Sequence, residues 1–257
     1  MLSLVKTEVD EDRLSDIHFL LTSSDRRRMI EELLTQSLKL NEVAKKLDIT
    51  ATEAFRQLQR LTDAGLLEKT SDSKYRSTSY SRLILESSSA MHFLSKHRKY
   101  FLEHDISLIP PQFRARFGEL SKTVLLTEPV PNLNTGIEVL KSAGTRIDLM
   151  AEYRLEQHGQ MTRQRSLAGV KIRRLVQESL IESMKEGHIA DMQPGEWRVI
   201  PRVCAVLFIT EKSAGIAFRK LDGEMDYQVF AGTDSDSIRW ASDLFEDQWN
   251  KAMPWHP

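Results

Sequence analysis

The chain has 257 residues, 40% of them hydrophobic, which is enough for two domains of ordinary size that each bury a core. A formal net charge of −1 excludes a histone-like protein whose whole surface is cationic. The single cysteine excludes an internal disulfide and a multi-thiolate metal site, and the sequence lacks the run of about 18 apolar residues that a membrane span needs. We therefore expect a soluble, cytoplasmic protein with no membrane partner.

An acidic N-terminal arm leads into a series of predicted helices. Residues 12–21 form an amphipathic stretch, and a helix that begins at Asp25 places Met29, Ile30 and Leu33 on one stripe. A further helix starts near Asn41 and ends before a turn of three or four residues. A short turn of this kind between two helices is typical of the helix-turn-helix motif.

The helix after this turn lies within the segment ITATEAFRQLQRLTDAGLLEK and can be capped by Thr50 or Thr52. Its apolar spacing predicts an inward face made of Ala51, Ala54, Phe55, Leu58 and Leu61. The residues left for the outward face are Thr52, Glu53, Arg56, Gln57 and Arg60. The side chains on the outward face are therefore expected to be mostly long and rich in hydrogen-bond donors.

Gly65 is expected to end the helix, because glycine adopts the left-handed conformation found at helix ends at the least cost. Two short strands are then predicted around the polar residues 70–73. The order of elements over residues 25–82 is that of a winged helix-turn-helix. We assign residues 1–80 to a DNA-binding domain on this basis. Residues 24–82 contain 12 Lys or Arg and 9 Asp or Glu, a net charge of 12 − 9 = +3, so DNA affinity would come from a local patch.

The outward residues of the third helix have the chemistry that base recognition needs. Arg can make paired hydrogen bonds with guanine, Gln can do so with adenine, and Thr can contact phosphate or a thymine methyl group. The residues predicted to contact bases are Thr52, Arg56 and Gln57. The residues predicted to contact phosphate are Thr50, Lys69, Lys74 and Arg76. Glu53 and Arg60 complete the predicted DNA-binding set. The alternative is a protein–protein module with a solvated polar helix face.

A long connector helix is predicted over residues 81–105, because this stretch is rich in apolar residues and contains neither glycine nor proline. Connectors of this kind commonly pair across a two-fold axis in winged-helix repressors. We therefore expect a homodimer on double-stranded DNA, with its two recognition helices about 34–36 Å apart, one turn of the duplex.

The segment from Tyr100 to Leu120 reads YFLEHDISLIPPQFRARFGEL, a pattern of the form YFxxHDxSxIPxxFxxRxGEL. With a winged helix preceding it, this pattern resembles archaeal regulators that carry a FilR-type middle domain, the methanogenesis and filament-formation regulator family. The resemblance covers nearly the whole chain. It implies an archaeal transcription factor whose C-terminal part is an α/β signal-sensing or oligomerising domain.

Residues 106–257 also indicate an α/β domain from their own pattern. A strand over 145–151, a helix over 157–167 and a strand over 169–176 make a right-handed βαβ unit and hence a parallel sheet. Ligands of such sheets bind beyond the carboxyl ends of the strands. The residues predicted to line a ligand site are Glu152, Tyr153 and Gln177. The predicted fold class is α+β and α/β, a winged helix-turn-helix joined by a long helix to an α/β sensing domain.

A catalytic alternative rests on His97, Lys99 and Asp105, which are similar to the HxKxxxxD signature of phospholipase D-type phosphotransferases. The spacing departs by one residue and the sequence holds no second copy. We predict no catalytic residue, no cofactor and no metal site, and a DNA-binding transcriptional regulator that a small-molecule effector modulates through the C-terminal domain. The alternatives are an α/β enzyme or nuclease-like domain tethered to DNA, and a ligand-free architectural adaptor.

Overall fold

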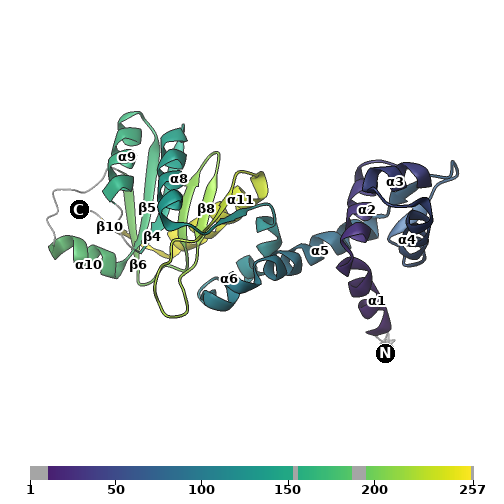
Figure 1. The fold of residues 1–257 in the computed structure, drawn as a ribbon. Coiled ribbons are helices and arrows are strands. Elements are labelled where there is room, and N and C mark those ends of the chain that lie inside the picture. Colours follow the sequence, from purple (N-terminus) through teal and green to yellow (C-terminus); the bar gives the residue numbers. More distant parts are fainter. Residues whose placement is uncertain (1–10, 153–155, 187–194, 256–257) are drawn as a thin grey trace, which may run out of the picture. The chain divides into compact units, whose positions relative to one another are not determined.

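The computed structural model describes residues 11–152, 156–186 and 195–255. The chain divides into two compact units, Met1–Ser87 and Ser88–Pro257 (Figure 1). We refer to the first as the N-terminal unit and to the second as the sheet unit. In the part of the chain that the structure describes, every helix is too short or too polar to cross a membrane.

The N-terminal unit has the predicted order of helices and strands. Its elements are α1 (Glu11–Thr22), α2 (Ser24–Thr35), α3 (Leu40–Leu47), α4 (Ala51–Asp63), β1 (Leu67–Lys69) and β2 (Tyr75–Ser77). The antiparallel pair β1–β2 is the wing. Apolar residues from α1 to β2 form one core, in which Met29, Ile30, Leu58 and Leu61 are fully buried. The winged helix-turn-helix prediction is therefore confirmed.

Polar caps set the ends of these helices. Ser23, two residues before the predicted Asp25, accepts a hydrogen bond from the Arg26 backbone and begins α2. Asp48 adopts a left-handed conformation with φ of 56° and ends α3. Thr50 then accepts from the backbone N–H of Glu53 at 3.2 Å and begins α4. The turn between α3 and α4 is thus three residues long.

The predicted connector over residues 81–105 is not one continuous helix. The chain forms α5 (Ser79–Lys96) and α6 (Arg98–Glu103), separated at His97. The His97 ring lies 5.0 Å from the rings of both Phe93 and Phe230, so the backbone turns where this side chain enters the aromatic core of the sheet unit. A pattern free of glycine and proline did not indicate this break, because its cause is a packing contact.

The sheet unit contains an eight-stranded mixed sheet in the order β10-β6-β5-β4-β7-β8-β9-β3. The strands are β3 (Val124–Leu126), β4 (Arg146–Ala151), β5 (Lys171–Gln177), β6 (Glu196–Ile200), β7 (Val206–Thr210), β8 (Ala214–Ala217), β9 (Val229–Gly232) and β10 (Met253–Trp255). The predicted parallel pairing of β4 with β5 is confirmed, and β6 extends it. On its other side β4 pairs with β7 in the antiparallel sense. The direction of pairing therefore changes at β4.

Helices cover both faces of this sheet (Figure 1). One face packs against α8 (Pro129–Ser142), α9 (Glu156–Leu167) and α10 (Glu178–Glu186). The other packs against α11 (Ser235–Lys251), with α7 (Pro111–Arg114) and the 3-10 turn η1 (Phe117–Leu120) beside it. Along β4, Ile147 and Leu149 belong to the core on the α8 side, whereas Met150 belongs to the core on the α11 side. This alternation is that of a strand buried on both faces.

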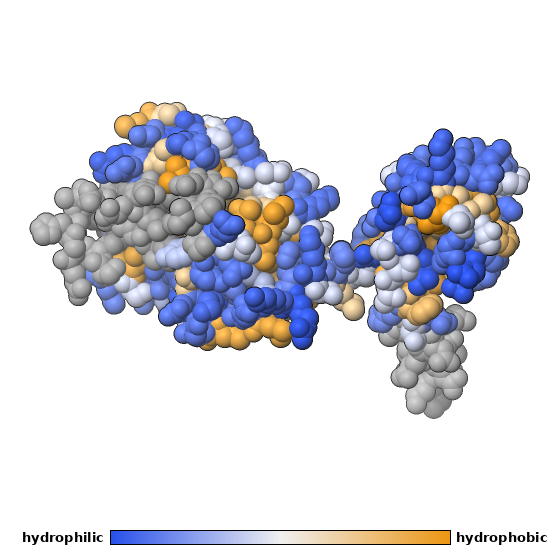
Figure 2. Space-filling view, in the orientation of Figure 1, coloured by the Kyte–Doolittle hydropathy of each residue, from blue (hydrophilic) through white to orange (hydrophobic). Residues whose placement is uncertain are grey.

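Apolar side chains are not confined to these cores. Figure 2 shows hydrophilic residues over most of the visible face of each unit, interrupted by apolar patches. The large exposed apolar side chains of the N-terminal unit include Phe19, Phe55, Tyr80 and Leu83. One of these, Phe55, lies on α4, where the apolar spacing predicted an inward position.

Candidate nucleic-acid interface and a charged cleft

The outward face of α4 consists of Ala51, Thr52, Phe55, Arg56, Gln59 and Arg60. These six side chains are all exposed, and the Arg56 side chain is 61% exposed. The opposite face buries Ala54, Gln57, Leu58 and Leu61. A helix that presents long polar side chains in this way can enter the major groove, where its N-terminal residues contact base edges.

The predicted outward position of Gln57 is wrong. Gln57 is only 7% exposed, and its side-chain oxygen accepts a hydrogen bond of 3.2 Å from the guanidinium of Arg26. Arg26 is itself buried, and its remaining donors bind the backbone oxygens of Phe19 and Leu20, both at 2.7 Å. A buried guanidinium needs acceptors on every side. Gln57 supplies one and is therefore withdrawn from the base-contacting set.

The predicted inward positions of Phe55 and Ala51 are also wrong, since Phe55 is 54% exposed and Ala51 is exposed as well. The hydrogen bond to Arg26 holds Gln57 on the buried face of α4. A helix that buries Ala54, Gln57, Leu58 and Leu61 leaves Phe55 on its exposed side. Gln59 takes the outward place that the pattern had given to Gln57.

Glu53 links the buried and exposed sides of α4. Its carboxylate accepts hydrogen bonds from the Gln57 amide and from the Arg56 guanidinium, the latter at 2.6 Å. The Gln57 hydrogen bond, and after it the charges of Arg56 and Arg60, lower the pKa of Glu53. Glu53 is therefore ionised near neutral pH and holds Arg56 in place on the helix surface.

The predicted phosphate contacts of the wing are exposed cations, each with a partner on the same hairpin. Lys74 lies 2.8 Å from Asp72, and Arg76 lies 2.6 Å from Glu68. Lys69 sits over the ring of Tyr75, 5.7 Å from its centroid. Exposed ion pairs such as these stabilise a fold by only about 0–1 kcal/mol, so phosphate could replace the carboxylates at little cost.

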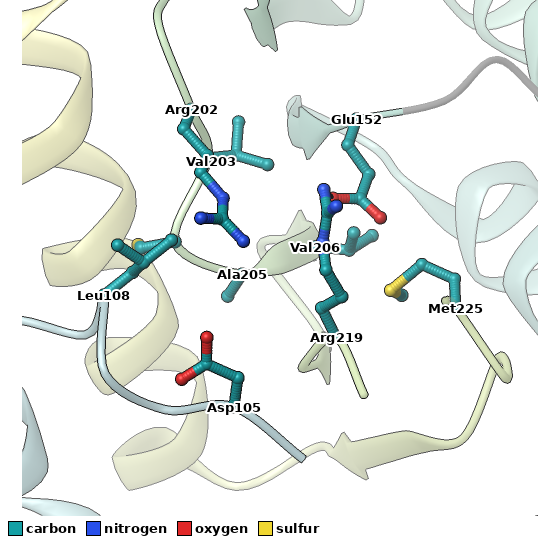
Figure 3. A pocket seen from close by; sticks show the side chains of 10 residues that line it. Asp105, Leu108, Glu152, Arg202, Val203, Ala205, Val206, Arg219 and Met225 are labelled. Atoms are coloured by element: carbon teal, nitrogen blue, oxygen red, sulfur yellow. Dashed lines mark hydrogen bonds and ion pairs between the residues drawn. The ribbon is translucent and has the colours of Figure 1, made fainter. Parts of the chain in front are cut away.

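A charged cleft lies where the inner strands β4, β7 and β8 begin or end (Figure 3). Its volume is about 280 Å³, including space open to solvent. Two arginines and two carboxylates line it together with apolar and small side chains: Asp105, Leu108, Glu152, Arg202, Val203, Cys204, Ala205, Val206, Arg219 and Met225. Glu152 follows the carboxyl end of β4, Val206 begins β7, and Arg219 follows β8. The cleft is therefore at the carboxyl end of β4, the strand where the pairing direction changes.

The two arginines of the cleft differ in their partners. Arg219 forms an ion pair with Glu152 and a long hydrogen bond, 3.4 Å, to the Gly223 backbone oxygen. The guanidinium of Arg202 makes no hydrogen bond or ion pair with a described residue, and Figure 3 shows it extending over Ala205. Arg202 is thus the cation of the cleft with donors available for a bound anion.

Asp105, from the HDIS part of the motif, lines this cleft and is held by its neighbours in the chain. Tyr100 stacks on His104 with ring centroids 3.6 Å apart, and its hydroxyl accepts from the Phe218 backbone. The Asp105 carboxylate accepts a 2.7 Å hydrogen bond from the Ser107 backbone. Hydrogen bonds from Ser107, and then the charges of Arg202 and Arg219, lower the pKa of Asp105. The motif therefore holds an ionised carboxylate at the cleft.

The predicted ligand-site residues separate in the structure. Glu152 lines the cleft, whereas Gln177, at the end of β5, hydrogen-bonds to Ser179 and is not part of the lining. Tyr153 lies outside the described residues. Of the catalytic alternative, only Asp105 reaches the cleft, while His97 packs on Phe93 and Phe230. Asp105 therefore lines the cleft without His97 or Lys99.

Two family models match separate parts of the chain. Residues 14–96 match the HVO_A0261 N-terminal domain, and residues 132–251 match the middle domain of the methanogenesis regulatory protein FilR1. Each of these two segments is therefore similar to a domain of a known family. The YFxxHD segment, residues 100–120, lies between the two matched ranges. A search of curated proteins gives no significant match.

Solved structures resemble the chain only distantly. TrmBL2, described as an archaeal chromatin protein, has 14% identity and a TM-score of 0.42, over 96% of this chain and 100% of that one. NucT from Helicobacter pylori has 12% identity and a TM-score of 0.44, over 52% and 99%. A homodimeric winged helix-turn-helix domain, Mb0332 from Mycobacterium bovis, has 17% identity and a TM-score of 0.31, over 41% and 99%. These likenesses carry no argument about function.

Sequence reasoning missed several residues of these two sites. On α4 it missed Phe55 and Gln59, and in the cleft it missed Arg202 and Arg219 and gave Asp105 only a catalytic role. The exchange of Gln57 for Gln59 has no local signal, because it involves the buried Arg26 on another helix. The two arginines follow different strands of the sheet, and no local spacing marks them as neighbours.

Proposed function

We propose that the protein is a DNA-binding transcriptional regulator that binds an operator through α4 and the wing. The observation that carries the proposal is the outward face of α4, where an anchored Arg56 and the unburied Thr52 and Gln59 follow a capped helix start. Arg56 has the geometry for paired hydrogen bonds to guanine, and Thr52 and Gln59 lie beside it on the same face. The match of residues 132–251 to the middle domain of a regulatory protein supports the same role.

The proposal includes a homodimer on double-stranded DNA. Two copies related by a two-fold axis would place their α4 helices about 34–36 Å apart and require an operator with inverted half-sites. Sedimentation of the protein with a selected duplex would show two chains per duplex. One chain per duplex would remove the dimer from the proposal and leave DNA binding in place.

The operator can be found by selecting random duplexes on the full-length protein. Arg56→Ala should then weaken binding by about 1–3 kcal/mol, because a paired arginine–guanine contact is lost. Arg28→Ala is the matched control, since Arg28 is an exposed arginine on α2 that also has an acidic neighbour, Asp25. Equal affinities for Arg56→Ala and the control, with both variants folded, would overturn the assignment of α4 to the groove.

We propose further that the sheet unit modulates operator occupancy by binding a small anion in the charged cleft. Arg202 supports this, since its guanidinium has no hydrogen-bond partner among described residues. The ionised Asp105 and the carboxyl oxygens of Glu152 could accept hydroxyl or ammonium donors from the same ligand. The ligand class is a small carboxylate or phosphate that also carries hydrogen-bond donors. To regulate, it must bind the DNA-competent and DNA-incompetent states with different affinity.

A metabolite screen tests this second part. A ligand at 100 times its dissociation constant stabilises the protein by about 2.7 kcal/mol, which raises the melting temperature, and an effector must also change operator affinity. Arg202→Ala should abolish both effects, while Arg163→Ala, an exposed arginine on α9, should keep them. Chemical turnover of a hit would favour an enzyme. An absence of hits, with operator binding unchanged, would favour a ligand-free adaptor.

A further inference from the structure

Phe55 is the large apolar side chain on the outward face of α4. It is 54% exposed, and it is not part of the core that α4 shares with α2 and α3. An exposed phenylalanine leaves a large apolar surface in water, and this surface contributes no burial free energy to the fold. Its position on a face otherwise made of donors and small residues points to a partner that covers it.

The neighbours of Phe55 show what kind of partner this is. Ala51 lies one turn before Phe55, and Thr52 lies beside it, so two small groups and one aromatic ring form an apolar strip on the first turns of α4. Arg56 and Arg60 flank the strip, and both are exposed. An apolar strip bordered by cations suits a polyanion that carries apolar groups between its charges.

We infer that Phe55 recognises thymine through its C5 methyl group. The major groove of a duplex displays hydrogen-bonding atoms on every base edge and one apolar group, the thymine methyl, which phenylalanine side chains can contact. The N-terminal part of a recognition helix is the part that meets base edges, and Phe55 lies in the second turn of α4. The inference rests on the proposed operator binding and specifies one base of the operator.

A second copy of the chain is the competing occupant of this strip. Pairing two copies of α4 through Phe55 would bring Arg56 and Arg60 of both copies together, and like charges oppose such a contact. DNA phosphates instead attract the same two arginines. The charges around Phe55 therefore favour the duplex.

The test removes one methyl group at a time from the DNA. Each thymine of the selected operator is replaced by deoxyuridine, which keeps every hydrogen-bonding atom, and affinities are measured for the wild-type protein and for Phe55→Ala. At one thymine of each half-site we expect about a fourfold loss for the wild type, the factor for one buried methyl group, and no loss for Phe55→Ala. Phe19→Ala removes a similarly exposed ring, 62% exposed, from α1 and should keep the fourfold loss.

The outcomes separate the inference from the proposed function. Failure of the wild type to bind any duplex would overturn operator binding itself. Operator binding that is insensitive to every deoxyuridine, or equally sensitive in Phe55→Ala, would overturn the thymine contact and leave operator binding standing. A Phe55→Ala protein that changes its oligomeric state in the absence of DNA would assign the ring to a contact between copies, which also overturns the inference. Melting by circular dichroism verifies that the exposed substitution leaves the fold intact.

Discussion

The outward face of α4 and the charged cleft differ in where their side chains come from. On α4 the polar groups lie within ten residues and pair at helical spacing, as Glu53 does with Arg56. The cleft joins Asp105, Glu152 and Arg219, which are far apart in the chain and meet because β4, β7 and β8 lie side by side. A local site can be described from periodicity, whereas a site between strands depends on the whole sheet.

The same contrast appears in the partners of one arginine from each unit. In the N-terminal unit Arg26 is satisfied by neighbouring backbone oxygens and by one distant side chain, Gln57. In the sheet unit the Arg173 guanidinium reaches two carboxylates from different elements, Asp148 on β4 and Glu246 on α11. Five variants test this contrast, from the core to the surface.

The largest expected effect is that of Trp240→Ala in the sheet unit. Trp240 is fully buried, and its indole N–H donates to the Phe113 backbone oxygen at 3.0 Å. We expect a loss of about 3–5 kcal/mol in the free energy of unfolding, from the cavity and the lost hydrogen bond. All four tryptophans lie in the sheet unit, so urea denaturation followed by tryptophan fluorescence reports on that unit. A loss below about 1 kcal/mol would show that this core collapses around the cavity.

Glu211→Gln should destabilise the sheet unit by about 1.5–3 kcal/mol at neutral pH, the range for hydrogen bonds to a charged group. Burial raises the pKa of Glu211, but backbone N–H groups including Gly144 at 2.7 Å and Thr145 at 3.3 Å outweigh it and lower the pKa to about 2 from 4.5.

The pH dependence gives the sign of this contribution. Because the folded pKa is the lower one, the stabilisation is present above pH 4.5 and is lost as the pH falls towards 2. Stability measured from pH 6 to pH 2 should therefore fall less steeply for Glu211→Gln than for the wild type. Parallel curves would show that the charge of Glu211 does not stabilise the backbone at Gly144 and Thr145.

Gln57→Ala and Gln59→Ala form a matched pair on α4. Gln57→Ala removes one of the three acceptors of the buried Arg26 and should cost about 1–3 kcal/mol in stability. Gln59→Ala removes an exposed side chain that bonds only Asp63 among described residues, and it should change stability by less than about 0.5 kcal/mol while weakening operator binding. Equal stability losses would contradict the assigned orientation of α4.

The smallest expected effect on stability is that of the double substitution Lys74→Ala and Arg76→Ala in the wing. Both residues are exposed and pair with exposed carboxylates, so melting should change little. Operator binding should show a flatter dependence of log affinity on log salt, by about one to two units, since each phosphate contact contributes about 0.9. A slope equal to that of the wild type would place the wing away from the duplex.

The sequence by itself determined the elements of both units and their order. Apolar spacing, the caps at Ser23 and Thr50 and the polar tip over residues 70–73 act over a few residues, and they predicted the winged helix-turn-helix. The strand–helix–strand spacing over residues 145–176 likewise predicted the parallel pair β4–β5. These features are local, and so their free energies follow from residues adjacent in the chain.

Only the tertiary structure decided which side chains face the two sites. On α4, polarity favoured burying Phe55 and exposing Gln57, but Gln57 is buried as an acceptor of Arg26 and Phe55 is exposed. In the sheet, the antiparallel return of β7 beside β4 brought Arg202 and Arg219 to Glu152. Both results depend on partners distant in the chain, because desolvating a charged group costs more than exposing one aromatic ring.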